Sequence, residues 1–234
     1  MDIIGLALTP DEIHDAAARL ETAPPEDVLA WALQTFGTGV SLASSFGAED
    51  MCLVDMLCGL TDHPRVFYLD TGLLFQETYA LIEATRHRYG FDPIRLTPLL
   101  TVEEQAETLG PELWLRAPDR CCGIRKVEPL THFLSTERAW VTGIRRKQTP
   151  ARQNARVVEA DAKFGLVKLN PLARWTHQDV WRYIHAHGVS YNPLHDQGYP
   201  SIGCWPCTSQ VLPGQDPRSG RWKNFDKTEC GLHE

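Results

Sequence analysis

Short apolar runs alternate with longer segments of mixed polarity over most of this chain. Runs of four or five residues, each bounded by polar or turn-forming residues, predict buried strands at residues 40–44, 65–69, 93–96 and 139–143. The intervals between them are long enough for helices. Strands that alternate with helices form a mostly parallel sheet with right-handed crossovers. The pattern therefore predicts an α/β fold in which helices flank one sheet.

Capping residues mark the ends of two predicted helices. Thr9 and Glu12 have the spacing of a capping box before the first amphipathic segment. Gly90 follows the helix after the second strand and is expected to end it. An apolar helix after residue 50 carries Cys52 and Cys58, and free cysteine is among the residue types most often buried. We expect these two cysteines to pack in the core.

Segments of small and polar residues follow three of the predicted strands. In α/β sheets, ligands bind outside the carboxyl ends of the strands. Residues 44–50 read Ser-Ser-Phe-Gly-Ala-Glu-Asp, which could expose backbone N–H groups to an anion at a helix start. The segment is neither a Walker A loop nor a glycine-rich dinucleotide motif, so an ordinary capped turn is the alternative. Residues 70–72 allow the same two interpretations.

A basic loop follows the fourth predicted strand. Residues 145–152 contain three arginines and a lysine, within a protein whose formal net charge is −7. Arginine suits phosphate and sulfate because its planar fork donates paired hydrogen bonds. The alternative is a solvated basic loop. Arg218 and Arg221 add positive charge further along the chain, so we expect any anionic ligand to be held by a local basic cluster.

Composition narrows the class of protein. The 234 residues are 43% hydrophobic and could form one α/β domain, predicted at residues 1–209, followed by a mobile Gly- and Pro-rich tail at 210–234. No run approaches 18 apolar residues and no signal peptide is recognisable, which predicts a cytoplasmic protein with no membrane partner. The acidic balance argues against nucleic acid as a partner.

Five of the seven cysteines form an unusual pattern. Cys121 and Cys122 are adjacent, Cys204 and Cys207 form a second close pair, and Cys230 lies near the end of the chain. Two pairs of thiolates suit an iron–sulfur cubane, whose separate iron corners accommodate adjacent ligands. Zinc usually takes two Cys-x₂-Cys pairs, and only one is present here. A cluster is therefore favoured over zinc, a disulfide or unrelated thiols.

Together these motifs resemble one family over nearly the whole chain. The motifs are Cys-Cys-Gly-Ile-Arg-Lys-Val-Glu-Pro at 121–129, the Cys204/Cys207 pair, and the terminal Glu-Cys-Gly-Leu-His at 229–233. They are similar to those of assimilatory adenylyl-sulfate (APS) reductases, a group within the phosphoadenylyl-sulfate (PAPS) reductases. The resemblance implies an adenine nucleotide α-hydrolase-like fold, one 4Fe–4S cluster, and reduction of APS to sulfite and AMP in sulfate assimilation and cysteine biosynthesis. Thioredoxin or a glutaredoxin would be the reductant.

The resemblance also implies a role for individual positions. Cys230 would be the nucleophile that takes the sulfonate and forms S-sulfocysteine. The cluster ligands would be Cys121, Cys122, Cys204 and Cys207. The phosphosulfate would be neutralised by Lys126, Arg145, Arg146, Arg218 and Arg221. The nucleotide would be held by Ser44, Ser45, Gly47, Leu69, Asp70, Thr71 and Gly72.

Three other functions remain open at this point. The nearest is the same reaction on PAPS, although the sequence Gly47-Ala48-Glu49-Asp50 and the paired cysteines favour APS. A non-catalytic iron–sulfur sensor would leave the Cys230 segment without a purpose. An adenylating ATP-pyrophosphatase would be expected to carry a Ser-Gly-Gly-x-Asp-Ser loop. The oligomeric state is not fixed by the sequence, and a homo-oligomer is one form to test.

Overall fold

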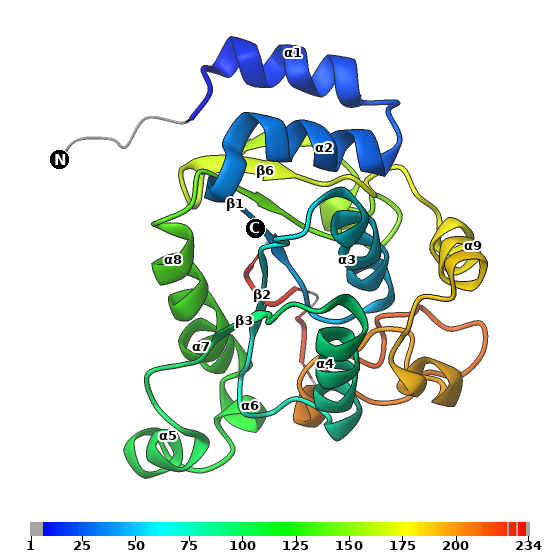
Figure 1. Ribbon diagram of the computed structural model, residues 1–234. Coiled ribbons are helices and arrows are strands. Elements are labelled where there is room, and N and C mark those ends of the chain that lie inside the picture. The colour runs from blue at the N-terminus through cyan, green and yellow to red at the C-terminus, as the bar shows by residue number, and fades with distance from the viewer. Residues whose placement is uncertain (1–6, 224, 228, 233–234) are drawn as a thin grey trace, which may run out of the picture.

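A computed structural model describes residues 7–223, 225–227 and 229–232 (Figure 1). Within them, six strands form one sheet in the order β3-β2-β1-β4-β6-β5. Five of the strands are parallel, and β5 runs antiparallel to β6. The predicted α/β fold with a mostly parallel sheet is therefore confirmed. The strands are β1 (Val40–Ala43), β2 (Val66–Leu69), β3 (Ile94–Leu96), β4 (Ala139–Val141), β5 (Val158–Asp161) and β6 (Leu166–Leu169).

All four predicted strands are present, each one or two residues shorter than the run that predicted it. The hairpin of β5 and β6 is an addition that the apolar pattern missed. Polar residues alternate with apolar ones in β5, where Glu159 and Asp161 follow Val158 and Ala160. A four-residue strand of this kind gives a weak apolar signal, and its pairing with β6 depends on tertiary contacts.

Helices α3 to α8 lie in the intervals between strands, whereas α1 and α2 precede β1 and α9 follows β6. Thr9 and Glu12 form the predicted capping box, with the Glu12 N–H donating to Thr9 Oγ1 at 3.3 Å and the Thr9 N–H donating to Glu12 Oε2 at 2.7 Å. Gly90 ends α4 in the left-handed region, at φ +70°, as predicted. The helices are α1 (Pro10–Leu20), α2 (Pro25–Phe36), α3 (Ala48–Leu60), α4 (Gln76–Tyr89), α5 (Val102–Leu109), α6 (Leu113–Arg116), α7 (Pro118–Cys122), α8 (Glu128–Leu134) and α9 (His177–His187).

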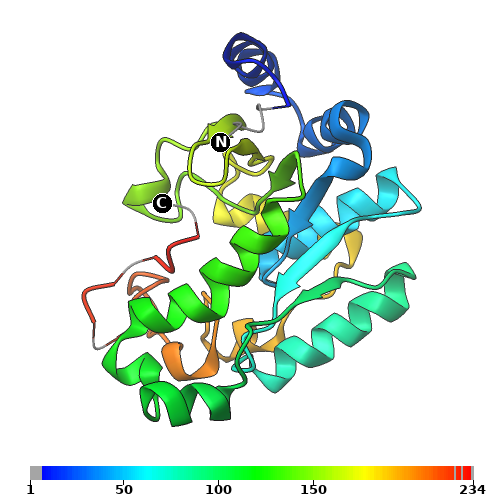
Figure 2. The same ribbon diagram turned by 90° about the vertical axis from the view of Figure 1, so that its left-hand side faces the viewer.

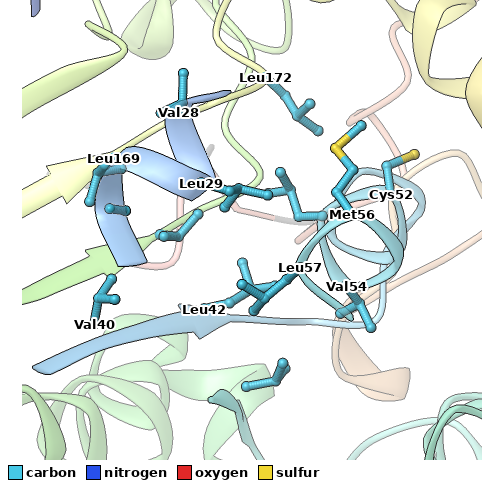
Figure 3. Close-up of a cluster of buried hydrophobic side chains, with 14 of the residues drawn as sticks. Val28, Leu29, Val40, Leu42, Cys52, Val54, Met56, Leu57, Leu169 and Leu172 are labelled. Atoms are coloured by element: carbon cyan, nitrogen blue, oxygen red, sulfur yellow. The ribbon is translucent and has the colours of Figure 1, made fainter. Parts of the chain in front are cut away.

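The main core lies between the sheet and the helices α2 and α3. Figure 3 shows Leu29 of α2 and Leu57 of α3 beside the β1 residue Leu42, all of them buried. Cys52 is fully buried in this core, and its Sγ donates to the Val180 carbonyl at 3.8 Å. The predicted packing role of Cys52 is confirmed, and Cys58 packs against the edge of the same cluster.

A second, smaller core lies on the opposite face of the sheet. Leu130 and Leu134 of α8 pack there against Phe67 of β2 and Trp140 of β4. Seen from this side, α8 lies in front of the sheet, and the C-terminal segment runs close to the helices (Figure 2). Leu232 joins the edge of the second core. The end of the described chain is therefore packed against the body of the protein.

The tail predicted from residue 210 is tied back to the preceding segment by backbone hydrogen bonds. The Ser209 N–H donates to the Gly220 carbonyl at 2.9 Å, and the Trp222 N–H donates to the Cys207 carbonyl at 3.1 Å. The domain boundary at 209 and the movement of the tail stay predictions. None of the helices in the described ranges is both long and apolar enough to cross a membrane.

Candidate active site

A cavity of about 830 Å³ opens at the carboxyl edge of the sheet. This volume is typical of small-molecule sites. The edge lies where the strand order changes direction around β1, which is where open α/β sheets bind ligands. The predicted site residues that line the cavity are Ser44, Ser45, Gly47, Leu69, Thr71, Lys126, Arg145, Cys204, Arg218, Arg221 and Cys230.

Side-chain hydrogen bonds fix the loop between β1 and α3, which lines this cavity. Ser45 donates from both its N–H and its hydroxyl to Asp50 Oδ2, each at 2.6 Å, and the Phe46 N–H donates to Ser44 Oγ at 3.1 Å. Phe46 is buried at φ +57°, an uncommon conformation for a large side chain and one that concentrates at functional sites. Gly47 then caps α3, whose first amides have no intrahelical partner and attract anions.

The pKa values of Asp50 and Glu49 are shifted in opposite directions although the two residues are neighbours. Burial raises the pKa of Asp50 to about 6, against the lowering effect of its hydrogen bonds with Ser45. Burial also acts on Glu49, yet Arg145 holds the pKa of Glu49 below its usual range. Arg145 Nη2 lies 2.7 Å from Glu49 Oε1, and Arg145 Nε donates to the same oxygen at 2.8 Å. The simple capped turn, in which both acids only complement the helix dipole, does not describe this loop.

Three residues predicted to bind substrate do not line the cavity. Arg146 forms a two-pronged ion pair with Glu21, at 2.6 and 3.0 Å. Its position is the result of a contact with a residue 125 positions away, which loop composition alone does not show. The carboxylate of Asp70 is buried and accepts from Arg95, Tyr79 and the N–H of Gly72. Asp70 and Gly72 therefore shape the turn after β2 and do not border the cavity.

The remaining cations divide into two groups. Arg152 donates to both carboxylate oxygens of Glu229, at 2.7 and 2.8 Å, and Arg218 Nη2 lies 3.3 Å from Glu229 Oε2. Lys126 and Arg221 also line the cavity, and no carboxylate within the described ranges forms an ion pair with either. Lys147 lines the cavity as well but is exposed to solvent, so Lys126 and Arg221 are the less exposed cations that an anionic ligand could meet.

The sequence interpretation missed the acidic partners of these arginines. Glu229 was read only as part of the terminal motif, and Glu49 as part of the capped turn. Arg152 belongs to the predicted basic loop but had no assigned role. One signal was present: Glu229 directly precedes Cys230, the predicted nucleophile, so its carboxylate was a candidate partner for an arginine of the predicted basic loop.

Two chain segments bring the four paired cysteines together. Cys121 and Cys122 end α7, which continues into a five-residue π-helical turn at Gly123–Val127. Such turns are frequent at functional sites. Cys204 and Cys207 lie on a short 3₁₀ turn that docks against the end of β2, where Thr71 Oγ1 and Cys204 Sγ form a hydrogen bond at 3.2 Å.

The four cysteines surround one small cavity, which Arg125 and Lys126 also line. Within the described residues, no three Cys, His, Asp or Glu side chains lie close enough to share a single metal ion. A cubane binds each thiolate at a separate iron, so its ligands surround it without meeting at one point. The donor set and its arrangement around a common cavity therefore fit a cluster of this kind.

Ionisation of these buried thiols requires a positive charge nearby. Burial raises the pKa of Cys121 to about 12 and that of Cys207 to about 11, and the neighbouring thiolates add to both shifts. A thiolate at such a site needs a compensating cation, which bound metal supplies. Burial opposes the charge on Lys126, but the thiolates of Cys204, Cys230 and Cys122 raise its pKa overall.

Comparison with known proteins assigns the chain to a family. Residues 39–210 match the phosphoadenosine phosphosulfate reductase domain. The chain is 50% identical to adenosine 5'-phosphosulfate reductase 2 of Bacillus subtilis over 212 residues, 89% of each protein. It is 48% identical to the adenosine 5'-phosphosulfate reductase of Shouchella clausii over 216 residues, 92% of this chain and 90% of that protein.

Solved structures agree with this assignment. The phosphoadenylyl-sulfate reductase of Candida auris, in a phosphate complex, superposes with a TM-score of 0.77 at 30% identity, over 88% of this chain and 100% of that one. The FMN adenylyltransferase of Candida glabrata shares the fold alone, with a TM-score of 0.58 at 16% identity, over 95% of this chain and 80% of that one. The chain belongs to the phosphoadenosine phosphosulfate reductase family.

Proposed function

We propose that this protein reduces APS to sulfite and AMP in sulfate assimilation, with Cys230 as the nucleophile. One observation carries the proposal: Cys230 lines the same cavity as the loop at Ser44 and the cations Lys126 and Arg221. A nucleotide held at the loop would place its charged end among those cations, next to the thiol. The names of the relatives that are 46–50% identical point to the same reaction.

In the first step, the Cys230 thiolate attacks the sulfur of APS. An S–S bond forms, the bond between sulfur and the phosphate oxygen breaks, and AMP leaves with that electron pair. The enzyme then holds S-sulfocysteine at position 230. Attack of one anion on another needs positive charge nearby, and Lys126 and Arg221 supply it at the wall of the cavity.

In the second step, a thiolate of thioredoxin or a glutaredoxin attacks Cys230 Sγ. The S–S bond to the sulfonate breaks, sulfite leaves with the electron pair, and a mixed disulfide remains. The second thiol of the reductant resolves the mixed disulfide and regenerates Cys230. The dithiol supplies both electrons, so no other redox centre has to change its oxidation state. This cycle requires a reducing compartment, which agrees with the predicted cytoplasmic location.

The 4Fe–4S cluster of this proposal would be held by Cys121, Cys122, Cys204 and Cys207. When bound, it would supply a structural link and a local charge beside the substrate. Lys126 lines both the cysteine cavity and the large cavity, so its ammonium connects the two sites. Stoichiometric zinc in place of iron and sulfide in anaerobically prepared protein would contradict this part of the proposal.

The same chemistry on PAPS is the alternative. The PAPS reductase of Candida auris is 30% identical, whereas the relatives named for APS reach 50%. We therefore expect kcat/KM to be higher for APS than for PAPS. Measuring both nucleotides under the same reducing conditions decides between them.

The decisive experiment for the main proposal uses Cys230→Ser. The variant should bind AMP as the parent protein does, retain iron and sulfide, and release no sulfite from APS. Peptide mapping after anaerobic incubation of the parent protein with radiolabelled APS should place the label on Cys230. Sulfite release by the variant, or a label on another side chain, refutes the assignment of the nucleophile.

A further inference from the structure

The carboxylate next to the reactive thiol is unusually well fixed for a residue so near the chain end. Glu229 is 5% exposed. Its Oε1 accepts from Arg152 Nε at 2.8 Å and from Thr149 Oγ1 at 3.2 Å. Its Oε2 accepts from Arg152 Nη2 at 2.7 Å and from Arg218 Nη2 at 3.3 Å. Both oxygens are thus bound, and the contact with Arg152 is two-pronged, the most directional form of an arginine–carboxylate pair.

The carboxyl group of Glu229 is ionised in the folded protein. Burial would raise the pKa of Glu229, but the hydrogen bond and charge of Arg152, with the charge of Arg218, hold it below its usual range. A buried carboxylate that loses such a partner would be left uncompensated, so the pair resists separation. The backbone of residue 229, and with it the attachment point of the Cys230 side chain, is therefore held in one place.

The pair also connects the thiol segment to the nucleotide loop. Arg152 Nη1 donates to Gln148 Oε1 at 2.7 Å, and Gln148 Nε2 donates to Glu49 Oε1 at 3.1 Å. Glu49 belongs to the first turn of α3, directly after the loop at Ser44–Gly47, and is fixed by Arg145. An unbroken series of side-chain contacts thus runs from the loop that would hold the nucleotide to the residue preceding the nucleophile.

The anchor leaves the large cavity open and leaves Lys126 and Arg221 in its wall without a carboxylate partner among the described residues. The cavity has a volume of about 830 Å³ in the arrangement in which Glu229 is bound to Arg152. Cys230 lines the cavity in this same arrangement. Lys126 and Arg221 remain without a carboxylate partner among the described residues, so a substrate anion can be neutralised without displacing Glu229. The Glu229–Arg152 contact is therefore compatible with an occupied site.

We propose that Glu229 is the positioning residue of Cys230: the Glu229–Arg152 pair sets where the thiol lies over the bound nucleotide. This inference rests on the proposed function, since it concerns the approach of Cys230 to the APS sulfur. Bond formation requires the two atoms to be held in a near-attack arrangement, and a small displacement is costly in rate. Nucleotide binding, by contrast, should depend mainly on the loop at Ser44–Gly47 and on Lys126 and Arg221, which lie outside the pair.

A single-turnover experiment with Glu229→Gln tests whether the pair affects sulfonation of Cys230 but not nucleotide binding. We measure the rate of Cys230 sulfonation by APS in the absence of reductant, by intact-protein mass, and the Kd of AMP by calorimetry. The sulfonation rate should fall about 100-fold, because the Cys230 thiol is no longer held in line with the sulfur of APS. The Kd of AMP should stay within about 2-fold of the parent value, since ground-state binding is not altered.

Further variants at position 152 separate a loss of positioning from a general loss of stability. Arg152→Lys keeps the charge but loses the planar fork, and should give an intermediate rate, reduced about 10-fold. If the two residues act as one unit, Glu229→Gln combined with Arg152→Gln should be no slower than the slower single variant.

The matched control is Glu137→Gln. Glu137 is equally buried and pairs with Arg65 at 2.6 Å, but at the opposite, amino edge of the sheet. This control should lose stability and keep the parent sulfonation rate. A similar loss of rate in Glu137→Gln would reduce the Glu229 effect to a folding defect and overturn the proposal.

The outcomes also distinguish this inference from the proposed function. Absence of any Cys230 adduct in the parent protein refutes the function itself. An adduct that forms at the parent rate in Glu229→Gln refutes only the positioning role. Tighter AMP binding in Glu229→Gln would show that the carboxylate competes with the ligand, which also overturns the inference.

Discussion

Single side chains in the cavity differ in whether their charge is already balanced. Arg145, Arg152 and Arg218 each contact a carboxylate, whereas Lys126 and Arg221 contact none among the described residues. A cation that already has a buried carboxylate has less free energy to offer an incoming anion. Neutralisation of the substrate's negative charge should therefore depend most on Lys126 and Arg221.

This difference predicts unequal effects of removing each charge. Lys126→Met and Arg221→Met should each lower kcat/KM for APS about 100-fold, in keeping with a lost hydrogen bond to a charged group. Arg146→Met should change kcat/KM by less than about 2-fold, because Arg146 binds Glu21 outside the cavity. Steady-state kinetics at fixed iron content measures all three. A large loss in Arg146→Met would mean that this side chain leaves Glu21 when substrate binds.

Among the secondary structure elements, β4 and α3 approach each other closely at one glycine. A Cβ added to Gly143, just after β4, would lie 2.2 Å from Asp50 Oδ1 and 3.1 Å from Glu49 Cβ. The Asp50 carboxylate cannot move aside without breaking its two hydrogen bonds to Ser45. Glycine at 143 thus allows the basic loop and the nucleotide loop to meet.

Gly143→Ala should therefore cost about 1–3 kcal/mol of stability and weaken AMP binding, because the clash displaces the nucleotide loop. Gly59→Ala is the control within the same helix, α3. A Cβ at Gly59 meets nothing within 4 Å, so the change should raise stability by about 0.5–1 kcal/mol and leave AMP binding unaltered. Thermal unfolding and calorimetry of the two variants test the pair of expectations. Unchanged AMP affinity in Gly143→Ala contradicts the close-approach argument.

Elements with local signals could be predicted from the sequence, and elements defined by distant contacts could not. The capping box of Thr9 needs only residues three positions apart, and the left-handed end at Gly90 needs only one glycine. The close cysteine pairs were also visible without a structure. By contrast, the roles of Arg146 and Arg152 depend on Glu21 and Glu229, which are 125 and 77 positions away. A loop rich in arginine predicts anion binding as a whole but not which arginine is already paired.

At the scale of the whole molecule, the cysteine site joins two segments that are far apart in the sequence. Cys121 and Cys122 belong to α7, whereas Cys204 and Cys207 belong to the segment that forms one wall of the large cavity. The docking of this segment on the end of β2 involves few bonds, including Trp205 N–H to Leu73 O at 2.8 Å. A cross-link between the two segments would therefore stabilise both the fold and the cavity wall.

Removal of the proposed cluster should consequently affect binding as well as stability. A cross-link closing a loop of about 80 residues contributes about 4.5 kcal/mol, which corresponds to a fall in Tm of about 9–18 °C for a protein of this size. The Kd of AMP should rise, because the segment carrying Cys204 loses its anchor and lines the nucleotide cavity. Anaerobic iron chelation, followed by scanning calorimetry and AMP titration, gives both values. Reconstitution with iron and sulfide should restore them together, whereas Tm recovery without recovery of AMP binding would show that the cluster stabilises the fold without shaping the cavity.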